Sequence, residues 1–317
     1  RLDTGTRIEE TESFSKEIND RLRQWIPPED LSMIITNAGV RYGFPAAFTP
    51  NSGTQDVFFN IELAPDRKHT TQFYASVIRN EMSKAFPKVD ISFELGGLLT
   101  SALNGGLASP IDLQILGKDS ATSRKIAEEI LPQIKKLQGA VDVRIQQRLD
   151  NPQLYLSVDR EKAGQYGLTV DGVMKSVVSA VSGSASFMPA IWVDPKSGID
   201  YLFGVQMPES NVKSLEDLKA ISLTGPQQDR SIPLSKVAEV KNSFGPSEIN
   251  HENLVNVIDI YVDAQGRDVG GLSQDVQVIL DHVKWPKGYS GEIRGEIREM
   301  NAAVGSLKGG FVLAAVL

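Results

Sequence analysis

The residue types that most often carry catalysis are few in this sequence of 317 residues. It contains no cysteine, which excludes disulfides, thiolate metal sites and a cysteine nucleophile. The histidines His69, His251 and His282 lack the spacing of metal ligands, and surface or structural roles are commoner for such residues. The motifs G-x-x-x-x-G-K-[ST], G-x-G-x-x-G and G-x-S-x-G are absent. We therefore expect no enzyme, no cofactor and no bound metal.

The composition is that of an ordinary globular protein, with 41% hydrophobic and 23% charged residues. A formal net charge of −7, without a run of Lys or Arg, argues against a surface for nucleic acid. The methionines are dispersed, whereas a copper or silver site needs thioether or thiolate ligands close together. This dispersal favours organic ligands over soft metal ions. The six methionines are Met33, Met82, Met174, Met188, Met207 and Met300.

The stretch from residue 39 to residue 53, rich in glycine and proline, is the strongest candidate for ligand binding. It joins two predicted strands that a two-residue turn could connect, and long loops in compact domains are often functional. Its rings Tyr42, Phe44 and Phe48 suit an apolar ligand site in which burial supplies the affinity. The residues alone favour the alternative that these rings pin the loop to the core.

The strand that follows this loop alternates between two faces. Phe58 and Asn60 point to one side, and Phe59 and Ile61 to the other. A family resemblance, described below, implies that the side with Phe58 and Asn60 faces a ligand pocket, with Asn60 at a position where phenylalanine is usual.

Hydrophobic periodicity predicts an α+β fold in which one unit is written twice. The first copy has two helices and three strands in the order αβ–βαβ, and one more strand before residue 1 would complete the split βαβ, or ferredoxin-like, unit. These elements are a helix beginning near residue 8, strands at 31–39 and 57–63, a helix at 70–85 and a strand at 89–95.

The second copy is interrupted by an insertion between residues 151 and 247. We expect the insertion to be β-rich, with a helix near 169–181 capped by Thr169 and a short helix capped by Ser214. A capping box is also predicted at Thr6 for the first helix of the chain. The flanking elements are strands at 111–117, 141–147, 254–263 and 291–297 and helices at 120–137 and 268–283.

Residues 309–317 read GGFVLAAVL, which is far shorter than the roughly 20 apolar residues that cross a bilayer. Two interpretations stay open from the residues alone: the start of a membrane helix or a small core segment.

Several local sequences occur in an order that resembles the RND (resistance-nodulation-division) multidrug efflux pumps of the AcrB type, in the hydrophobe/amphiphile efflux family. The most extended is SVDREKAGQYGLTVDGV at residues 157–173. The others are GTRIEETE at 5–12, SPIDLQ at 109–114 and GRDVG at 266–270. The resemblance spans the whole chain and implies the second periplasmic loop of such a pump, without its membrane domain.

The resemblance implies four parts for this chain. Residues 1–107 would form a first ferredoxin-like porter subdomain that lacks its first strand, and 108–150 with 248–298 a second one. Residues 151–247 would form a docking subdomain, and 299–317 the start of a membrane helix.

The implied function is proton-driven efflux of hydrophobic or amphiphilic compounds. The fragment would face the periplasm from an inner-membrane homotrimer, which works with a periplasmic adaptor and an outer-membrane channel. A stand-alone ligand-binding module and an enzyme with an unrecognised site are the alternatives.

The resemblance also assigns roles to positions. The loop at 39–53 resembles the switch loop between two drug pockets. Phe93 and Leu95 resemble the apolar edge of the entrance cleft, and Arg144 an arginine at the cleft floor. Without the resemblance, Phe93 is a core residue and Arg144 an exposed strand cation.

Overall fold

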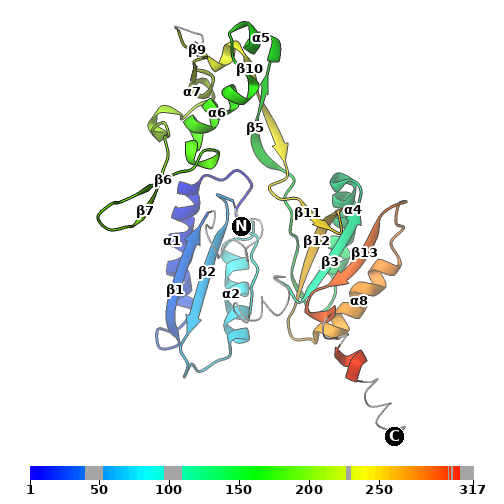
Figure 1. The fold of residues 1–317 in the computed structure, drawn as a ribbon. Coiled ribbons are helices and arrows are strands. Elements are labelled where there is room, and N and C mark those ends of the chain that lie inside the picture. The colour runs from blue at the N-terminus through cyan, green and yellow to red at the C-terminus, as the bar shows by residue number, and fades with distance from the viewer. Residues whose placement is uncertain (40–52, 96–108, 226–229, 299, 301–302, 308–317) are drawn as a thin grey trace. The chain divides into compact units, whose positions relative to one another are not determined.

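The computed structural model describes residues 1–39, 53–95, 109–225, 230–298, 300 and 303–307. The chain divides into two compact units, and each is treated by itself (Figure 1). Unit 1 contains Arg1–Asn151 and Phe244–Leu317, and unit 2 contains Pro152–Ser243. Within unit 1 we distinguish an N-terminal region, residues 1–95, from a five-stranded region, residues 109–151 with 244–298.

The N-terminal region places two helices against one two-stranded antiparallel sheet. The core side of the helices contains Ile18 and Leu22, four residues apart on one stripe, and Tyr74, Ile78 and Met82. The partly buried residues Phe59, Ile61 and Leu63 pack against them from the sheet, as the alternation in the sequence predicts. The elements are α1 (Ile8–Trp25), β1 (Leu31–Ala38), β2 (Val57–Leu63) and α2 (Thr71–Ala85).

Two expectations for this region are wrong. The capping box at Thr6 does not form, because Arg7 is the N-cap of α1 and the Thr6 hydroxyl donates to the Asp3 carbonyl instead. The strand at 89–95 is not present as a strand, because a strand needs a ladder and no described strand pairs with this segment. The segment makes a strand-like contact with Arg1, whose backbone exchanges two hydrogen bonds with Asp90.

The five-stranded region contains every helix and strand that the periodicity predicts, with shifts of a few residues at the ends. Strand β12 is central, with β3 along one edge and with β11 and β4 along the other, and all the pairs are antiparallel. Strand β13 pairs with the outer edge of β3. The elements are β3 (Ile111–Gly117), α4 (Ser120–Ile134), β4 (Ala140–Ile145), β11 (Asn250–Glu252), β12 (Val255–Ala264), α8 (Val269–Asp281) and β13 (Ser290–Arg294).

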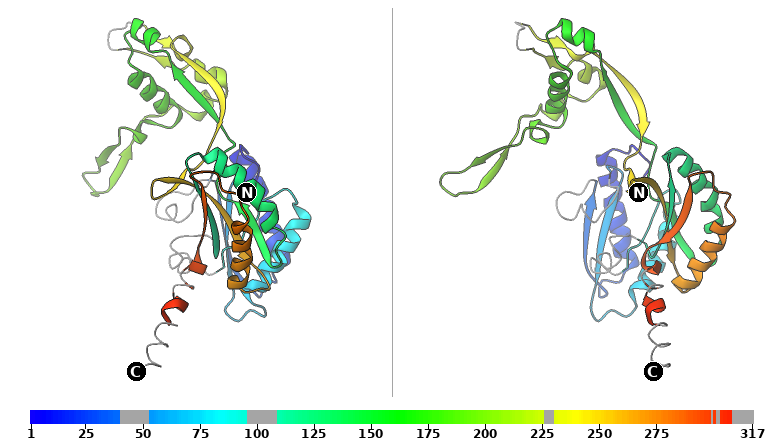
Figure 2. Two further views of the ribbon diagram at one scale, coloured as in Figure 1. Left: turned by 90° about the vertical axis from the view of Figure 1, so that its right-hand side faces the viewer. Right: turned by 45° about the vertical axis from the view of Figure 1, so that its right-hand side comes forward.

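Both helices cover the same face of this sheet (Figures 1 and 2). Leu113 and Ile260 lie on that face and are fully buried against Ile130 of α4 and Leu272 and Val276 of α8. Because side chains alternate along a strand, the neighbouring positions must point to the opposite face, and these are polar.

Unit 2 mixes short strands with three helices, and its core draws on the helices as much as on the strands, so "β-rich" describes it only in part. Thr169 caps α6 by accepting from the Gly172 amide, and Ser214 forms a capping box with Asp217, both as predicted. The elements are β5 (Asn151–Val158), α5 (Arg160–Gln165), α6 (Val170–Val181), β6 (Ala190–Val193), β7 (Asp200–Phe203), α7 (Leu215–Lys219), β8 (Ser222–Leu223), β9 (Ile232–Pro233) and β10 (Ala238–Gly245).

The expected membrane helix falls largely outside the described residues, because 308–317 are not described. Residues 303–307 are helical. Among the residues that the structure describes, no helix has both the length and the apolar character needed to cross a bilayer.

Candidate functional site

The predicted ligand-binding residues fall into three groups. Tyr42, Phe44 and Phe48 lie outside the described residues. Phe58 and Asn60 lie on β2, on the face opposite to Phe59 and Ile61, which are partly buried against the core, so the predicted alternation is present. Of the remaining three, Phe93 and Leu95 end the described part of the N-terminal region, and Arg144 lies on β4 of the five-stranded region.

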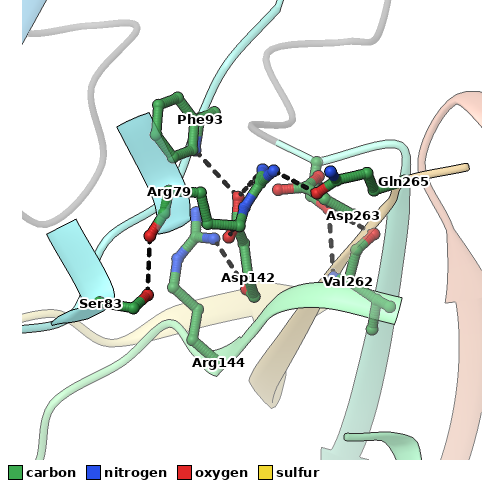
Figure 3. A network of polar contacts seen from close by, with 9 residues as sticks. Arg79, Ser83, Phe93, Asp142, Arg144, Val262, Asp263 and Gln265 are labelled. Atoms are coloured by element: carbon green, nitrogen blue, oxygen red, sulfur yellow. Dashed lines mark hydrogen bonds and ion pairs between the residues drawn. The ribbon is translucent and has the colours of Figure 1, made fainter. Parts of the chain in front are cut away.

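Phe93 and Arg144 come together around a carboxylate that the sequence did not single out, Asp142 (Figure 3). The Phe93 amide donates to Asp142 Oδ2 over 3.2 Å, and Arg144 Nη1 donates to the Asp142 carbonyl over 3.2 Å. Phe93 also packs against the core of the N-terminal region, so its core interpretation holds beside the site interpretation. Leu95 is exposed.

Asp142 owes its position to a local irregularity in β4. Tyr261 pairs with Arg144 and Asp263 pairs with Val141, so two residues of β4 stand opposite one residue of β12. This is a β-bulge, a device that redirects side chains and is common beside functional sites. Asp142 has φ +52, in the left-handed region that aspartate tolerates better than most residues. The bulge buries its side chain to 3% exposure.

Arg79 of α2 binds Asp142 with both arms of its guanidinium (Figure 3). The distances are 2.7 Å from Nε to Oδ1 and 2.7 Å from Nη2 to Oδ2. Arg79 Nη1 donates to Gln265 Oε1, and the guanidinium lies 4.7 Å from the centroid of the Phe93 ring. Bidentate pairing with a carboxylate and stacking on an aromatic ring are both contacts that arginine makes and lysine cannot reproduce.

Arg144 lies beside a pocket of about 320 Å³, which it lines together with Asp142. Its guanidinium is 5.2 Å from the centroid of the Tyr261 ring. Ile91, Val141 and other neighbours add apolar surface to a lining that is otherwise charged. Such a pocket offers cationic, anionic and apolar contacts to a small molecule. The lining residues are Asp90, Ile91, Lys135, Ala140, Val141, Asp142, Val143 and Arg144.

Asp263 lies two residues beyond Tyr261 on the same face of β12. Burial raises the pKa of Asp263 to about 7, although a hydrogen bond from Ser109 and the charges of Arg144 and Arg79 oppose the shift. The Ser109 hydroxyl donates to Asp263 Oδ1 over 2.9 Å.

A second carboxylate pair lies on the same polar face. Asp112 stands opposite Tyr261, and Asp259 stands opposite Gln114. Burial raises the pKa of Asp112 well above its ordinary value, and the Asp259 charge raises it further. Burial also raises the pKa of Asp259, against hydrogen bonds from Asn250, Gln147 and Gln114.

Three buried acceptor oxygens of this pair and the neighbouring Gln114 accept no hydrogen bond from the residues that the structure describes: Asp112 Oδ1, Gln114 Oε1 and Asp259 Oδ1. Such acceptors call for a proton, a water or a cation. Within the described residues, however, no group of three His, Cys, Asp or Glu side chains could hold a metal ion. The sequence signal for these acids was their period-two alternation with core residues, which normally indicates a solvated face.

A model of the AcrB/AcrD/AcrF family matches residues 1–317, the whole chain. Among curated relatives, the cobalt-zinc-cadmium resistance protein CzcA of Cupriavidus metallidurans is 25% identical over 311 residues, which are 96% of this chain and 28% of CzcA. The cation efflux system protein CusA of Escherichia coli K12 is 28% identical over 239 residues, 72% of this chain and 22% of CusA.

A crystal structure of a heavy metal efflux pump shares the fold. It superposes with a TM-score of 0.80 at 19% identity, over 99% of this chain and 32% of that pump. The chain therefore spans about a third or less of the length of the proteins that it matches.

Proposed function

The chain belongs to the AcrB/AcrD/AcrF family of RND efflux transporters, which are not enzymes, and we propose that it forms the periplasmic porter and docking portion of a proton-driven exporter. In this proposal the longer protein is a homotrimer in the inner membrane. It passes compounds to an outer-membrane channel with the help of a periplasmic adaptor. The family match over the whole chain also disfavours a stand-alone binding module.

The strand order supports two ferredoxin-like porter subdomains. In the five-stranded region the order β13–β3–β12–β4 is antiparallel throughout, and α4 and α8 cover one face, as in a split βαβ unit. In the N-terminal region the reciprocal bonds between Arg1 and Asp90 are those of an antiparallel strand pair.

Unit 2 is proposed as the docking subdomain, for assembly and not for ligand binding. Its β6–β7 hairpin extends from the helices of the unit (Figure 2), and both strands are exposed along their whole length. A two-stranded hairpin is marginal in water by itself, so contact with another subunit or component would stabilise it. The most exposed apolar side chains of these two strands are Ile191, Leu202 and Phe203.

Deleting the docking unit provides the test of this assignment. Replacing residues 152–243 by a short flexible linker in the full-length protein should spare folding of unit 1, because the core clusters of unit 1 contain no residue from this segment. Export and copurification with the outer-membrane channel should be lost. Retained export would show that unit 2 has another role.

Hydrophobic or amphiphilic compounds are the proposed substrates. The observation that carries this proposal is the pocket beside Asp142 and Arg144, whose lining joins charged groups to Ile91 and valine side chains. The proposed binding residues are Tyr42, Phe44, Phe48, Phe58, Asn60, Phe93, Leu95 and Arg144.

Export of dyes by the full-length protein tests the pocket. Arg144→Ala should reduce export of an anionic amphiphile several-fold more than export of a neutral one, because only the former loses an ionic contact. Arg124→Ala, on α4 and outside the pocket lining, is the matched control. Equal losses for both dyes would argue that Arg144 has only a structural role.

A metal cation is the second candidate substrate, favoured by the names of the relatives, which concern cobalt, zinc, cadmium and other cations. The chain offers Asp112, Gln114 and Asp259 as buried oxygen donors, which suit hard cations better than copper or silver. Titration calorimetry of the full-length protein with Zn²⁺, Co²⁺ and an organic dye distinguishes the candidates. Metal binding abolished by Asp112→Asn, with dye binding unchanged, would establish the cation.

A further inference from the structure

The N-terminal region and the five-stranded region have separate apolar cores. The cluster around Ile18, Leu22 and Ile78 shares no residue with the cluster around Leu113 and Ile260. We call the boundary between the two regions the seam. Two regions with separate cores are expected to move relative to one another unless a large apolar interface joins them.

Two ion pairs between described residues that cross this seam differ in burial. Arg148 binds Asp90 over 3.0 Å, but the Asp90 side chain is 65% exposed. Arg79 binds Asp142, whose side chain is 3% exposed. An exposed pair contributes little because water screens it, whereas breaking a buried pair by removing one partner is strongly unfavourable.

The buried pair is held ready on both sides. The β-bulge and the hydrogen bond from Arg144 to the Asp142 carbonyl fix Asp142 on the five-stranded region. The Phe93 amide, which belongs to the N-terminal region, donates to Asp142 across the seam. On the other side, Phe93 stacks on the Arg79 guanidinium and fixes its plane. Two groups that are each positioned before they meet can separate and reform the same bidentate contact with little loss of order.

We propose that Arg79 and Asp142 form a releasable latch between the two regions, and that its opening changes access to the pocket that Asp142 lines. The Arg79 guanidinium is the cation of this latch and the Asp142 carboxylate is its anion. Gln265 of the five-stranded region accepts a further hydrogen bond from the same guanidinium, and Asp142 also lines the pocket. The proposal rests on the proposed function in one respect: export is the process that would use the motion.

The test measures a distance, so that it does not depend on transport. In a cysteine-free full-length protein, nitroxide labels are attached at Asn80→Cys on α2 and Glu129→Cys on α4, both exposed positions on opposite sides of the seam. Pulsed electron–electron double resonance then gives the distribution of distances between the two labels. It is measured in the labelled protein that keeps Arg79 and in its R79Q, R79K and D90N variants.

The latch predicts at least a twofold increase in the population at longer distances for R79Q. R79K keeps the charge without the bidentate geometry and should lie between R79Q and the unchanged protein. D90N removes the exposed pair and should leave the distribution unchanged. If R79Q does not fold, the comparison of R79K with D90N decides in the same way.

Two results would overturn the latch. One is a distribution for R79Q, or R79K in its place, that equals the one with Arg79. The other is equal broadening in D90N, which would indicate general loosening of the seam. Loss of export in a protein whose labels still show the latch would argue against the proposed function alone.

Discussion

Both faces of the sheet in the five-stranded region contain fully buried side chains, but they are built from opposite chemistry. On the helix-covered face, Leu113 and Ile260 are fully excluded from solvent among other apolar side chains. On the other face Asp112 and Asp259 are 0% and 3% exposed. The first face needs no hydrogen bonds, whereas each acid on the second must find partners or take up a proton.

This difference indicates a division of labour between the faces. The apolar face gains free energy from burial and fixes the fold. On the polar face, burying carboxylates costs free energy, which their raised pKa values reflect, and the bulge that positions Asp142 interrupts the strand ladder. Costly groups of this kind are common at functional sites, which agrees with the placement of the candidate pocket beside the polar face.

The largest expected effect is on the apolar face. Leu113→Ala should lower the free energy of unfolding by about 2–5 kcal/mol, because it removes buried methyl groups and leaves a cavity. Urea unfolding of the purified chain measures the loss. The matched control is Leu154→Ala in unit 2, since Leu154 is 52% exposed. A Leu113→Ala loss no larger than the control would mean that this face is not the core.

The next effect concerns the acid on the polar face. The pKa of Asp263 is raised from 3.8 to about 7, so between these values the folded state binds a proton that the unfolded state has released. Stability from this group is full below pH 3.8 and is lost as the pH rises through about 7. Asp263→Asn should reduce the downward slope by up to about 1.4 kcal/mol per pH unit.

Urea unfolding at pH 5 and at pH 8 measures this slope. Asp112 and Asp259 also have raised pKa values, so part of the slope should remain in the variant. Asp281→Asn, on the exposed end of α8, is the control for replacing an aspartate by asparagine at the surface of the same region. Identical slopes for Asp263→Asn and the unaltered chain would place the Asp263 side chain in contact with solvent.

The apolar face could be predicted from the sequence, because Ile111, Leu113 and Ile115 show the period of two and the helices show the period of 3.6. The burial of Asp112 and Asp259 on the polar face could not be predicted from the sequence. Alternation on β12 indicates a solvated side, but Asp259 is bonded by Gln147, which is 112 residues away. Local patterns carry no information about such partners.

The candidate site shows the same limit. Phe93 and Arg144 were predicted through the family resemblance, and the structure places both beside Asp142. Arg79 and Asp142 themselves were missed, because they are 63 residues apart and because the left-handed backbone of Asp142 leaves no mark on an ordinary strand sequence.

A smaller effect is expected at the edge of the polar face. Arg144→Met should lower the free energy of unfolding by about 0.5–1 kcal/mol, because it removes the contact of the guanidinium with the Tyr261 ring. It should also raise the pKa of Asp263 further, because the Arg144 charge lowers that pKa. The midpoint of the pH dependence should move upward in Arg144→Met but not in Arg144→Lys. A downward movement would contradict the proposed proximity of the two groups.

The smallest effect is expected outside both faces, on the solvent side of α4. Glu128 and Arg124 form an ion pair one helical turn apart, with 2.8 Å between Nε and Oε1, and the Glu128 side chain is 54% exposed. Glu128→Gln should cost only about 0.3 kcal/mol, since water screens the pair and glutamine keeps a helix-compatible side chain. Urea unfolding in low and in 1 M salt checks this, because salt should remove most of the difference. A loss as large as that of Arg144→Met, or one that persists in high salt, would show that the surface of α4 is packed against something. The outer surface of α4 would then contribute to stability as the sheet faces do.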